Sequence, residues 1–107
     1  METRNVKFVV FVPISHADAV RQVLGEAGAG KIGNYTFCSF SSKGTGRFKP
    51  GSGSSPVIGQ VGRLEAVGEE RIETICSREN LKAVVDVVKK VHPYEEVAFD
   101  IYPLEEA

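Results

Sequence analysis

Apolar side chains near the start of the chain recur with two different periods, which predict a strand and then a helix. Residues 6–12 are almost continuously apolar and rich in β-branched side chains, as in a central strand covered on both faces. The helix that follows has one apolar face. That face consists of Ala17, Val20, Leu24 and Ala27. We expect Ser15 to cap its start, and Gly28 and Gly30 to end it.

The C-terminal part of the chain repeats this pair of elements in the opposite order. Apolar residues at helical spacing predict a second helix after a capping Ser77; they are Leu81, Val84, Val85, Val88 and Val91. Pro93 then ends the helix, because it has no backbone N–H to donate. A strand of period two follows over residues 97–102. It places Val97, Phe99 and Ile101 on one face and Ala98, Asp100 and Tyr102 on the other.

The middle of the chain predicts two further strands separated by a long connection. Alternating side chains favour a strand over residues 35–40. Residues 41–60 are rich in glycine and serine, and this stretch is too long for an ordinary hairpin turn. The next strand covers residues 61–76, with a bulge or bend expected at Gly68.

The resulting order, βαββαβ, indicates an α+β fold of the ferredoxin-like type. Residues 1–107 form one domain in this interpretation, with two helices on one face of a four-stranded antiparallel sheet. The other face, on which we expect Tyr35 and Tyr102, needs cover from the long hairpin or from another subunit. A homo-oligomer is therefore expected.

Charge and composition exclude some classes of partner. The net charge is −1, with 13 basic and 14 acidic side chains, so no patch suited to nucleic acid or to an anionic membrane is indicated. The apolar run near the N-terminus is too short to span a bilayer and has no signal-peptide cleavage region. Cys38 and Cys76 are therefore expected to be reduced, in the cytoplasm.

One glycine motif imitates a phosphate-binding loop. The segment GEAGAGKI, residues 25–32, has GxxxxGK spacing, but Ile32 stands where Ser or Thr would hold Mg²⁺. Gly25 also lies on the predicted helix, whereas the motif should follow a strand. We interpret these glycines as a helix C-cap and a tight turn.

The long connection carries the stronger candidate binding site. Lys43, Arg47 and Lys49 alternate with Gly44 and Gly46. Glycines allow backbone N–H groups to turn toward an anion, and the basic side chains add positive charge. A phosphate, a carboxylate or an acidic residue of a neighbouring subunit fits this pattern. The alternative is a solvated hairpin tip whose charges have no ligand.

A second polar cluster surrounds the exit of the last helix. His92 and Glu95 are candidate metal ligands, with Cys38 or Cys76 as a soft third ligand, and the cluster could also supply a general base. The interpretation we favour is structural: His92 caps the last helical carbonyls in its protonated form, and Glu95 pairs with a lysine. Glu96 would point away from Glu95 once the strand begins.

Asp100 is a separate case on the final strand. If its face is covered by a subunit contact, this carboxylate needs a partner such as Arg63 or Arg71.

Three blocks in order resemble a known family. GNYTFCSFSSKGTGRFKPG (33–51), RIETI (71–75) and HPYEEVAFDIYPL (92–104) are similar to the domain inserted in YqfO-type members of the Nif-three-like proteins. The resemblance covers nearly the whole chain and implies a PII/CutA-like ferredoxin fold. HPYE at 92–95 also resembles CutA, a trimeric protein linked to divalent-cation tolerance. The resemblance implies a trimer-forming module rather than a self-contained enzyme.

The di-metal site of the Nif-three-like proteins lies in segments flanking this domain, and nothing in the present sequence matches them. Neither that metal site nor a hydrolase activity is therefore carried over. In PII-like proteins the equivalent of residues 41–60 responds to ligands and partners.

Our leading hypothesis is a non-enzymatic, homotrimeric binding or regulatory module without a resident cofactor, whose loop 43–60 engages an anionic small molecule or a partner protein. The alternative is a CutA-like protein that binds a divalent metal through His92 and Glu95. A third hypothesis is a hydrolase whose di-metal site comes from a partner.

Overall fold

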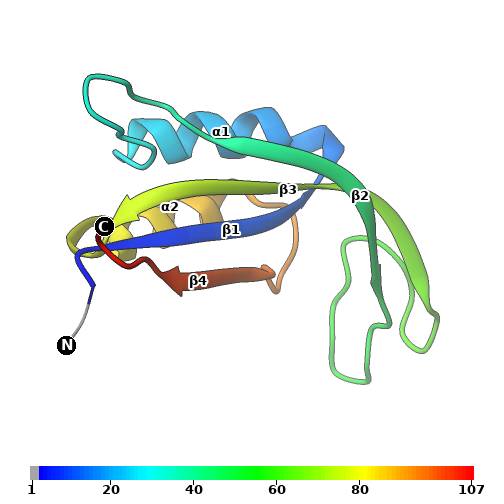
Figure 1. Ribbon diagram of the computed structural model, residues 1–107. Helices are drawn as coiled ribbons and strands as arrows, with labels where there is room; N and C mark the ends of the chain where they lie inside the picture. Colours follow the sequence, from blue (N-terminus) through cyan, green and yellow to red (C-terminus); the bar gives the residue numbers. More distant parts are fainter. Residues whose placement is uncertain (1–2) are drawn as a thin grey trace.

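Four antiparallel strands form one sheet in the order β2-β3-β1-β4, and both α-helices pack on the same face of it (Figure 1). The computed structural model describes residues 3–107. Its elements are β1 (Asn5–Pro13), the 3-10 turn η1 (Ile14–His16), α1 (Ala17–Glu26), β2 (Phe40–Phe48), β3 (Glu65–Ser77), the 3-10 turn η2 (Arg78–Asn80), α2 (Leu81–Val91) and β4 (Phe99–Pro103). The α+β, ferredoxin-like fold predicted from the sequence is confirmed.

The core lies between the sheet and the two helices. Alternate residues of β1 point into it, as the period of a strand requires, and the apolar stripes of both helices cover them. Its fully buried members include Val6, Phe8, Val10, Val12, Val20, Leu24, Ile72, Val84 and Val88. The helical stripes predicted from spacing are therefore the faces that pack on the sheet.

The helix starts differ from those predicted. Ser15 lies inside η1, and Ser77 precedes η2 without a side-chain capping bond. The caps of α1 and α2 are His16 and Asn80, and neither makes a side-chain capping hydrogen bond to its own helix. In both places a 3-10 turn inserts one extra turn between strand and helix, which moves each helix start downstream.

Helix α1 ends next to Gly28 and Gly30, as predicted from the sequence. Gly28 and Gly30 have φ angles of 95° and 80°, a region that residues with a Cβ rarely adopt. The Asn80 side chain at the start of α2 donates a hydrogen bond of 2.6 Å to the Ala27 carbonyl. This bond satisfies one of the helix-end carbonyls that lack an intrahelical partner.

The second strand was predicted in the wrong place. Residues 32–35 form a turn closed by the isolated bridge between Ile32 and Tyr35, residues 36–39 are not in a strand, and only Phe40 of the predicted strand belongs to β2. Strand β2 instead occupies the glycine-rich segment that had been assigned to the loop, pairing Phe40 with Glu73 and Phe48 with Glu65. The connection between β2 and β3 is therefore confined to residues 49–64.

Of the bulge or bend expected at Gly68, the structure has no bulge, because β3 is continuous there, but the curved arm begins at this residue. Gly68 pairs directly with Thr45, and pairing proceeds without interruption on both sides of it. A Cβ at Gly68 would lie 3.3 Å from the Ile14 side chain, so the glycine lets the turn η1 pack closely against the strand.

The outer parts of β2 and β3 extend past the end of β1. The pairing of β1 with β3 ends at Pro13 and Glu69, whereas β2 remains paired with β3 as far as Glu65. Residues 45–68 thus form a curved arm that projects from the body of the molecule (Figure 1). The radius of gyration is 14.8 Å, above the value of about 13 Å typical of a compact chain of this length.

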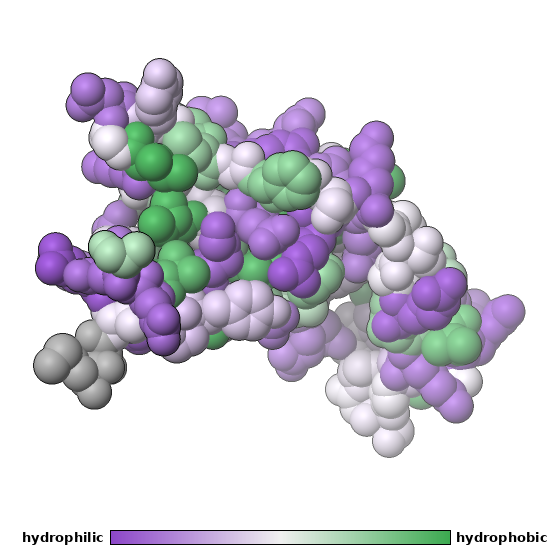
Figure 2. All heavy atoms as spheres, in the orientation of Figure 1, coloured by the Kyte–Doolittle hydropathy of each residue, from purple (hydrophilic) through white to green (hydrophobic). Residues whose placement is uncertain are grey.

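The face of the sheet opposite the helices is uncovered in the single chain. It carries Lys7, Arg71, Glu73 and Asp100, and Figure 2 shows hydrophilic side chains over its middle. Tyr102 lies on this face and is 44% exposed, as predicted; Tyr35 lies in the turn instead and is 75% exposed.

The two ends of the described chain lie side by side. The Leu104 amide donates a hydrogen bond of 3.2 Å to the Asn5 carbonyl, and Arg4 pairs with Glu106 at 3.3 Å. Within residues 3–107, neither α-helix has the length and apolar character that crossing a membrane requires.

Candidate functional site

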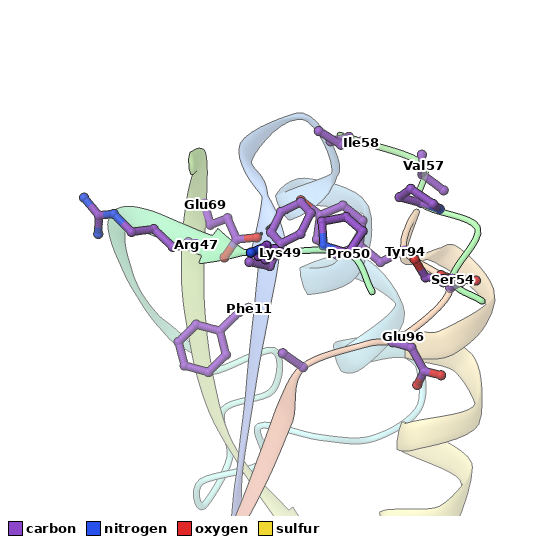
Figure 3. A pocket seen from close by; sticks show the side chains of 15 residues that line it. Phe11, Arg47, Lys49, Pro50, Ser54, Val57, Ile58, Glu69, Tyr94 and Glu96 are labelled. Carbon is purple, nitrogen blue, oxygen red and sulfur yellow. Dashed lines mark hydrogen bonds between the residues drawn. The ribbon is translucent and has the colours of Figure 1, made fainter. Parts of the chain in front are cut away.

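A cavity of about 500 Å³ lies between the arm and the segment that leads from α2 into β4. The arm contributes Phe48, Pro50 and residues 54–58, and the other wall is formed by Tyr94, Glu95 and Glu96 with Phe11 at the base (Figure 3). The two polar clusters that the sequence analysis treated separately therefore meet at one site. Their meeting depends on the curvature of the arm.

Tyr94 forms the wall opposite the arm. Its ring lies 5.8 Å from the Phe48 ring and 5.1 Å from the His92 ring, between centroids. Its hydroxyl donates a hydrogen bond of 3.4 Å to Glu69 Oε2. Burial, reinforced by the negative charge of Glu69 and by this bond, raises the pKa of Tyr94 to about 12. The phenol therefore remains a neutral hydrogen-bond donor at physiological pH.

Gly46 makes room for the carboxylate of Glu69. Glu69 belongs to β3, and its carboxylate extends over Gly46 of the neighbouring strand β2. A Cβ at residue 46 would overlap this carboxylate. Gly44 and Gly46 have ordinary strand conformations, since neither is among the residues of positive φ, and both pair with β3. The predicted role of these two glycines, to turn amides toward an anion, does not fit this geometry. Gly46 instead clears space in the concave side of the arm.

One hydrogen bond joins the connection 49–64 to the opposite wall of the cavity, and a second lies within the connection. The Ser55 amide donates a bond of 2.8 Å to Glu95 Oε1, and the Gly62 amide donates a bond of 2.8 Å to the Pro50 carbonyl. Pro50 itself is buried. Glu95 thus anchors the loop, which replaces the lysine pairing that had been expected for it.

His92 is a buried structural residue, although by different contacts from those predicted. It is 6% exposed, Nε2 lies 2.8 Å from the Phe11 carbonyl, and Nδ1 accepts a bond of 3.1 Å from the Tyr94 amide. Desolvation lowers the pKa of His92 more than the Phe11 carbonyl raises it. The neutral ring therefore joins β1 to the 92–98 junction, and the expected protonated helix cap is not formed.

The metal alternative gains no support from this geometry. Both His92 nitrogens are engaged, and Glu95 Oε1 holds Ser55. Among residues 3–107, no three His, Cys, Asp or Glu side chains are grouped so that they could hold a metal ion. Metal binding through His92 and Glu95 stays a prediction.

The three cations of the predicted site lie on or next to β2 rather than in a loop. Lys43 and Arg47 alternate with Ser42, Gly44 and Gly46, so they project from the convex side of the arm. Figure 3 shows Arg47 extending away from the cavity. Lys49 follows at the end of β2 and lines the cavity. No ion pair within residues 3–107 involves any of the three.

An ion-pair network fixes the base of the arm. Arg21 of α1 contacts Glu70 Oε1 at 2.6 Å, Asp18 Oδ1 at 2.6 Å and Ser41 Oγ at 3.0 Å. The hydrogen bonds to Asp18 and Glu70 raise the pKa of Arg21. Since Glu70 is buried and lies on β3, one guanidinium joins α1 to both strands of the arm.

The pairing considered for Asp100 is absent from the single chain. Arg71 contacts Glu73 at 3.6 Å and stands 5.6 Å from the centre of the Phe11 ring, while Asp100 is exposed.

Three lining residues of the site, Phe11, Phe48 and Glu69, were not predicted from the sequence. Phe11 and Phe48 were available as aromatic residues at strand ends, but nothing in their spacing indicated that they share a cavity. Glu69 was expected only to mark a bulge or bend next to Gly68, which gave no indication that its side chain lines a cavity.

Comparisons with known proteins match this chain to part of longer proteins. No family model matches the chain. The GTP cyclohydrolase 1 type 2 homolog of Halalkalibacterium halodurans is 57% identical over 98 residues, which are 92% of this chain and 26% of that protein. The protein of the same name from Bacillus subtilis is 53% identical over 100 residues, 94% of this chain and 27% of that one. The chain thus spans about a quarter of the length of these relatives.

A Bacillus cereus protein related to NIF3 superposes with a TM-score of 0.85 at 49% identity, covering 99% of this chain and 27% of that one. The chain is homologous to one segment of these NIF3-related proteins. The resemblance inferred from the three sequence blocks is confirmed.

Two further solved structures define the fold of this NIF3-related segment. CutA1 from Shewanella sp. SIB1 has a TM-score of 0.75 at 15% identity, with 100% of this chain and 87% of that chain covered. The PII-like protein CutA from Nostoc sp. PCC 7120 has a TM-score of 0.69 at 13% identity, with 94% and 81% covered. At such identities the likeness concerns the fold alone, and it confirms a small PII/CutA-like module.

Proposed function

We propose that this NIF3-related segment is a non-enzymatic binding module that assembles as a homotrimer and acts in the cytoplasm. Its arm would engage an anionic small molecule or the acidic surface of a partner protein. The observation that carries the proposal is the group of three cations on and next to the arm, Lys43, Arg47 and Lys49, none of which takes part in an ion pair within residues 3–107.

The position of these cations suits an intermolecular contact. Lys43 and Arg47 project from the same side of an exposed edge strand that is nine residues long. Charges on a projecting arm meet an approaching anion before the body of the protein does, and at about 0.1 M salt their attraction extends over about 10 Å. Both cysteines are free thiols, as expected in a reducing compartment.

Exposed apolar side chains on the arm and at the start of β2 support the assembly part of the proposal. Phe40, Val57, Val61 and Leu64 are between 51% and 72% exposed. A two-stranded ribbon is marginally stable by itself in water, and an open strand edge is a template for pairing. Contact with another copy of the chain would cover both the apolar residues and the edge of β2.

The names of the longer relatives do not define the activity proposed here. The chain spans about a quarter of the GTP cyclohydrolase 1 type 2 homologs, and the proposal assigns no catalytic residue.

A double variant, Arg47→Ala with Lys49→Ala, tests the anion-binding role. Citrate serves as a multivalent carboxylate probe, titrated at low ionic strength and followed by the amide resonances of residues 43–49. We expect the double variant to bind citrate about tenfold more weakly, because two charge-assisted contacts are lost.

The matched control removes the same charge elsewhere. Lys82→Ala with Lys90→Ala, on the exposed face of α2, should leave citrate binding within about twofold of the unaltered protein. Equal citrate affinity of the arm variant and the unaltered protein would rule out the proposed role.

A further inference from the structure

The cavity on the concave side of the arm has a chemistry different from that of its convex side. Most of its wall is apolar, with the rings of Phe11, Phe48 and Tyr94 and the side chains of Val57 and Ile58. Cavities of this size and apolar character are typical of small-molecule sites in proteins. This cavity is therefore large enough for an aromatic or branched aliphatic group.

Its polar groups are mainly negative. Glu69, Glu95 and Glu96 all line it, and no ion pair within residues 3–107 involves any of them. Two cationic residues, Arg47 and Lys49, belong to the lining, but the Arg47 side chain extends away from the cavity (Figure 3). Lys49 is therefore the cation that remains among the lining residues. The carboxylates thus outnumber the positive charge at the cavity.

Glu69 is the carboxylate that the structure holds in place. Tyr94 donates to its Oε2, and the missing side chain of Gly46 leaves space for its Oε1. The donor Tyr94 is neutral, so its hydrogen bond does not cancel the negative charge of Glu69. A cation placed beside it would also lie next to aromatic rings, whose faces attract positive charge.

We infer that this cavity binds an organic cation, an ammonium or guanidinium group attached to an apolar body, with Glu69 as its counter-ion and the Phe48 and Tyr94 rings as its walls. Charge complementarity carries the choice of ligand class. The inference rests on Glu69 and the aromatic walls rather than on the cations of the proposed anion site. Of those cations, Lys43 and Arg47 project from the opposite side of β2, and Lys49 lines the cavity.

The test uses two probes of the same shape and opposite charge. 2-Phenylethylamine and 3-phenylpropionate share a phenyl ring on a two-carbon chain, but one ends in an ammonium and the other in a carboxylate. Each is titrated into isotopically labelled protein, and the amides of Gly46, Phe48 and Tyr94 are followed. We expect these amide resonances to shift when the amine is added. We expect 3-phenylpropionate to bind at least about tenfold more weakly than the amine, since repulsion replaces a charge-assisted contact.

Glu69→Gln separates charge from shape, because it keeps the size of the side chain and removes its charge. We expect about tenfold weaker amine binding in this variant. Asp100→Asn, which removes a carboxylate from the exposed sheet face outside the cavity, should leave amine binding within about twofold. The amide spectrum of each variant also reports whether it is folded.

Three outcomes would overturn the inference: equal or tighter binding of 3-phenylpropionate, amine affinity unchanged by Glu69→Gln, or amine shifts located away from the cavity. Amine binding that weakens as the protein concentration is raised would also overturn it, since a second copy of the chain would then be the occupant. The citrate experiment with the Arg47 and Lys49 variant is scored separately, so either site can fail alone.

Discussion

At the scale of single residues, His92 shows how a titratable group serves the architecture of a site. Its ring donates to the Phe11 carbonyl through Nε2 and accepts from the Tyr94 amide through Nδ1. Only the neutral ring can make both bonds, because protonation would place a hydrogen on Nδ1. His92 therefore sets the position of Tyr94, and through it one wall of the cavity.

The lowered pKa of His92 predicts that stability falls in mild acid. In the unfolded chain the imidazole takes up a proton near its ordinary pKa of 6.5, whereas in the folded chain burial opposes protonation. The stabilisation is complete above 6.5 and is lost as the pH falls from there through the folded-state pKa. Thermal unfolding at pH 7.5 and pH 5.5 measures this loss.

His92→Gln supplies the comparison, because glutamine can also donate and accept but does not titrate in this range. We expect the variant to be less stable at pH 7.5 by about 1–3 kcal/mol, since its geometry differs from that of the ring. Its pH dependence should be shallower. An unchanged slope between pH 7.5 and pH 5.5 would show that another group is responsible.

The residue types around His92 were visible in the sequence, but their partners were not. HPYE at 92–95 suggested a polar cluster, and the structure does place His92, Tyr94 and Glu95 together. The Phe11 carbonyl and the Ser55 amide are backbone groups, and spacing along the chain carries no information about them. For this reason the sequence located the junction correctly and described its hydrogen bonds wrongly.

At the scale of secondary-structure elements, the arm depends on how its base is fixed. Arg21 joins α1 to Glu70 on β3 and to Ser41 on β2. The Glu70 side chain is 10% exposed, so its charge has little water to stabilise it. The Arg21 guanidinium therefore stabilises the folded strand pair at the point where it leaves the body of the molecule.

Arg21→Ala should destabilise the protein by about 2–3 kcal/mol, because it leaves the Glu70 carboxylate buried without a counter-charge. Chemical denaturation measures the change. The double variant Arg21→Ala with Glu70→Gln should recover part of the loss, since a neutral amide costs less to bury. Lys82→Ala removes an exposed pair with Asp86 and should change the stability by less than about 0.5 kcal/mol. A loss from Arg21→Ala no larger than this would contradict the role given to Arg21.

The helices, the first strand and the order of elements along the chain followed from periodicity, whereas β2 did not. Segment 40–48, FSSKGTGRF, contains two glycines and a lysine, residue types of low strand propensity, and its apolar residues are confined to the two ends. It forms a strand because β3 offers it a continuous partner. Tertiary pairing thus outweighs local strand preference here. The curvature of the paired strands, which creates the cavity, cannot be predicted from local sequence preferences.

At the scale of the whole molecule, the uncovered parts are the edge of β2, the arm and the sheet face opposite the helices. The arm lengthens the molecule to 45 Å along its longest axis, against 29 Å and 22 Å along the others. Contacts within such a two-stranded projection contribute little to its stability. Its conformation would be stabilised by neighbouring copies of the chain.

We predict a concentration-dependent assembly, with three copies as the expected size. Light scattering at micromolar concentration gives the mass, and hydrogen exchange of residues 40–48 reports on the β2 edge. Edge pairing should slow exchange of the β2 amides as the assembly forms, while the exposed turn at residues 31–37 serves as an internal control. A stable monomer at micromolar concentration, or β2 exchange that does not depend on concentration, would count against this assembly.

The adjacent chain ends have a consequence for how such a module can be used. Because the Leu104 amide bonds to the Asn5 carbonyl, a longer polypeptide could enter the module and leave it at almost the same point. A host protein could carry it as a cassette, without separating or distorting the segments on either side. The arm and its cavity lie at the opposite end of the sheet, so they would face away from the point where the module joins its host protein (Figure 1).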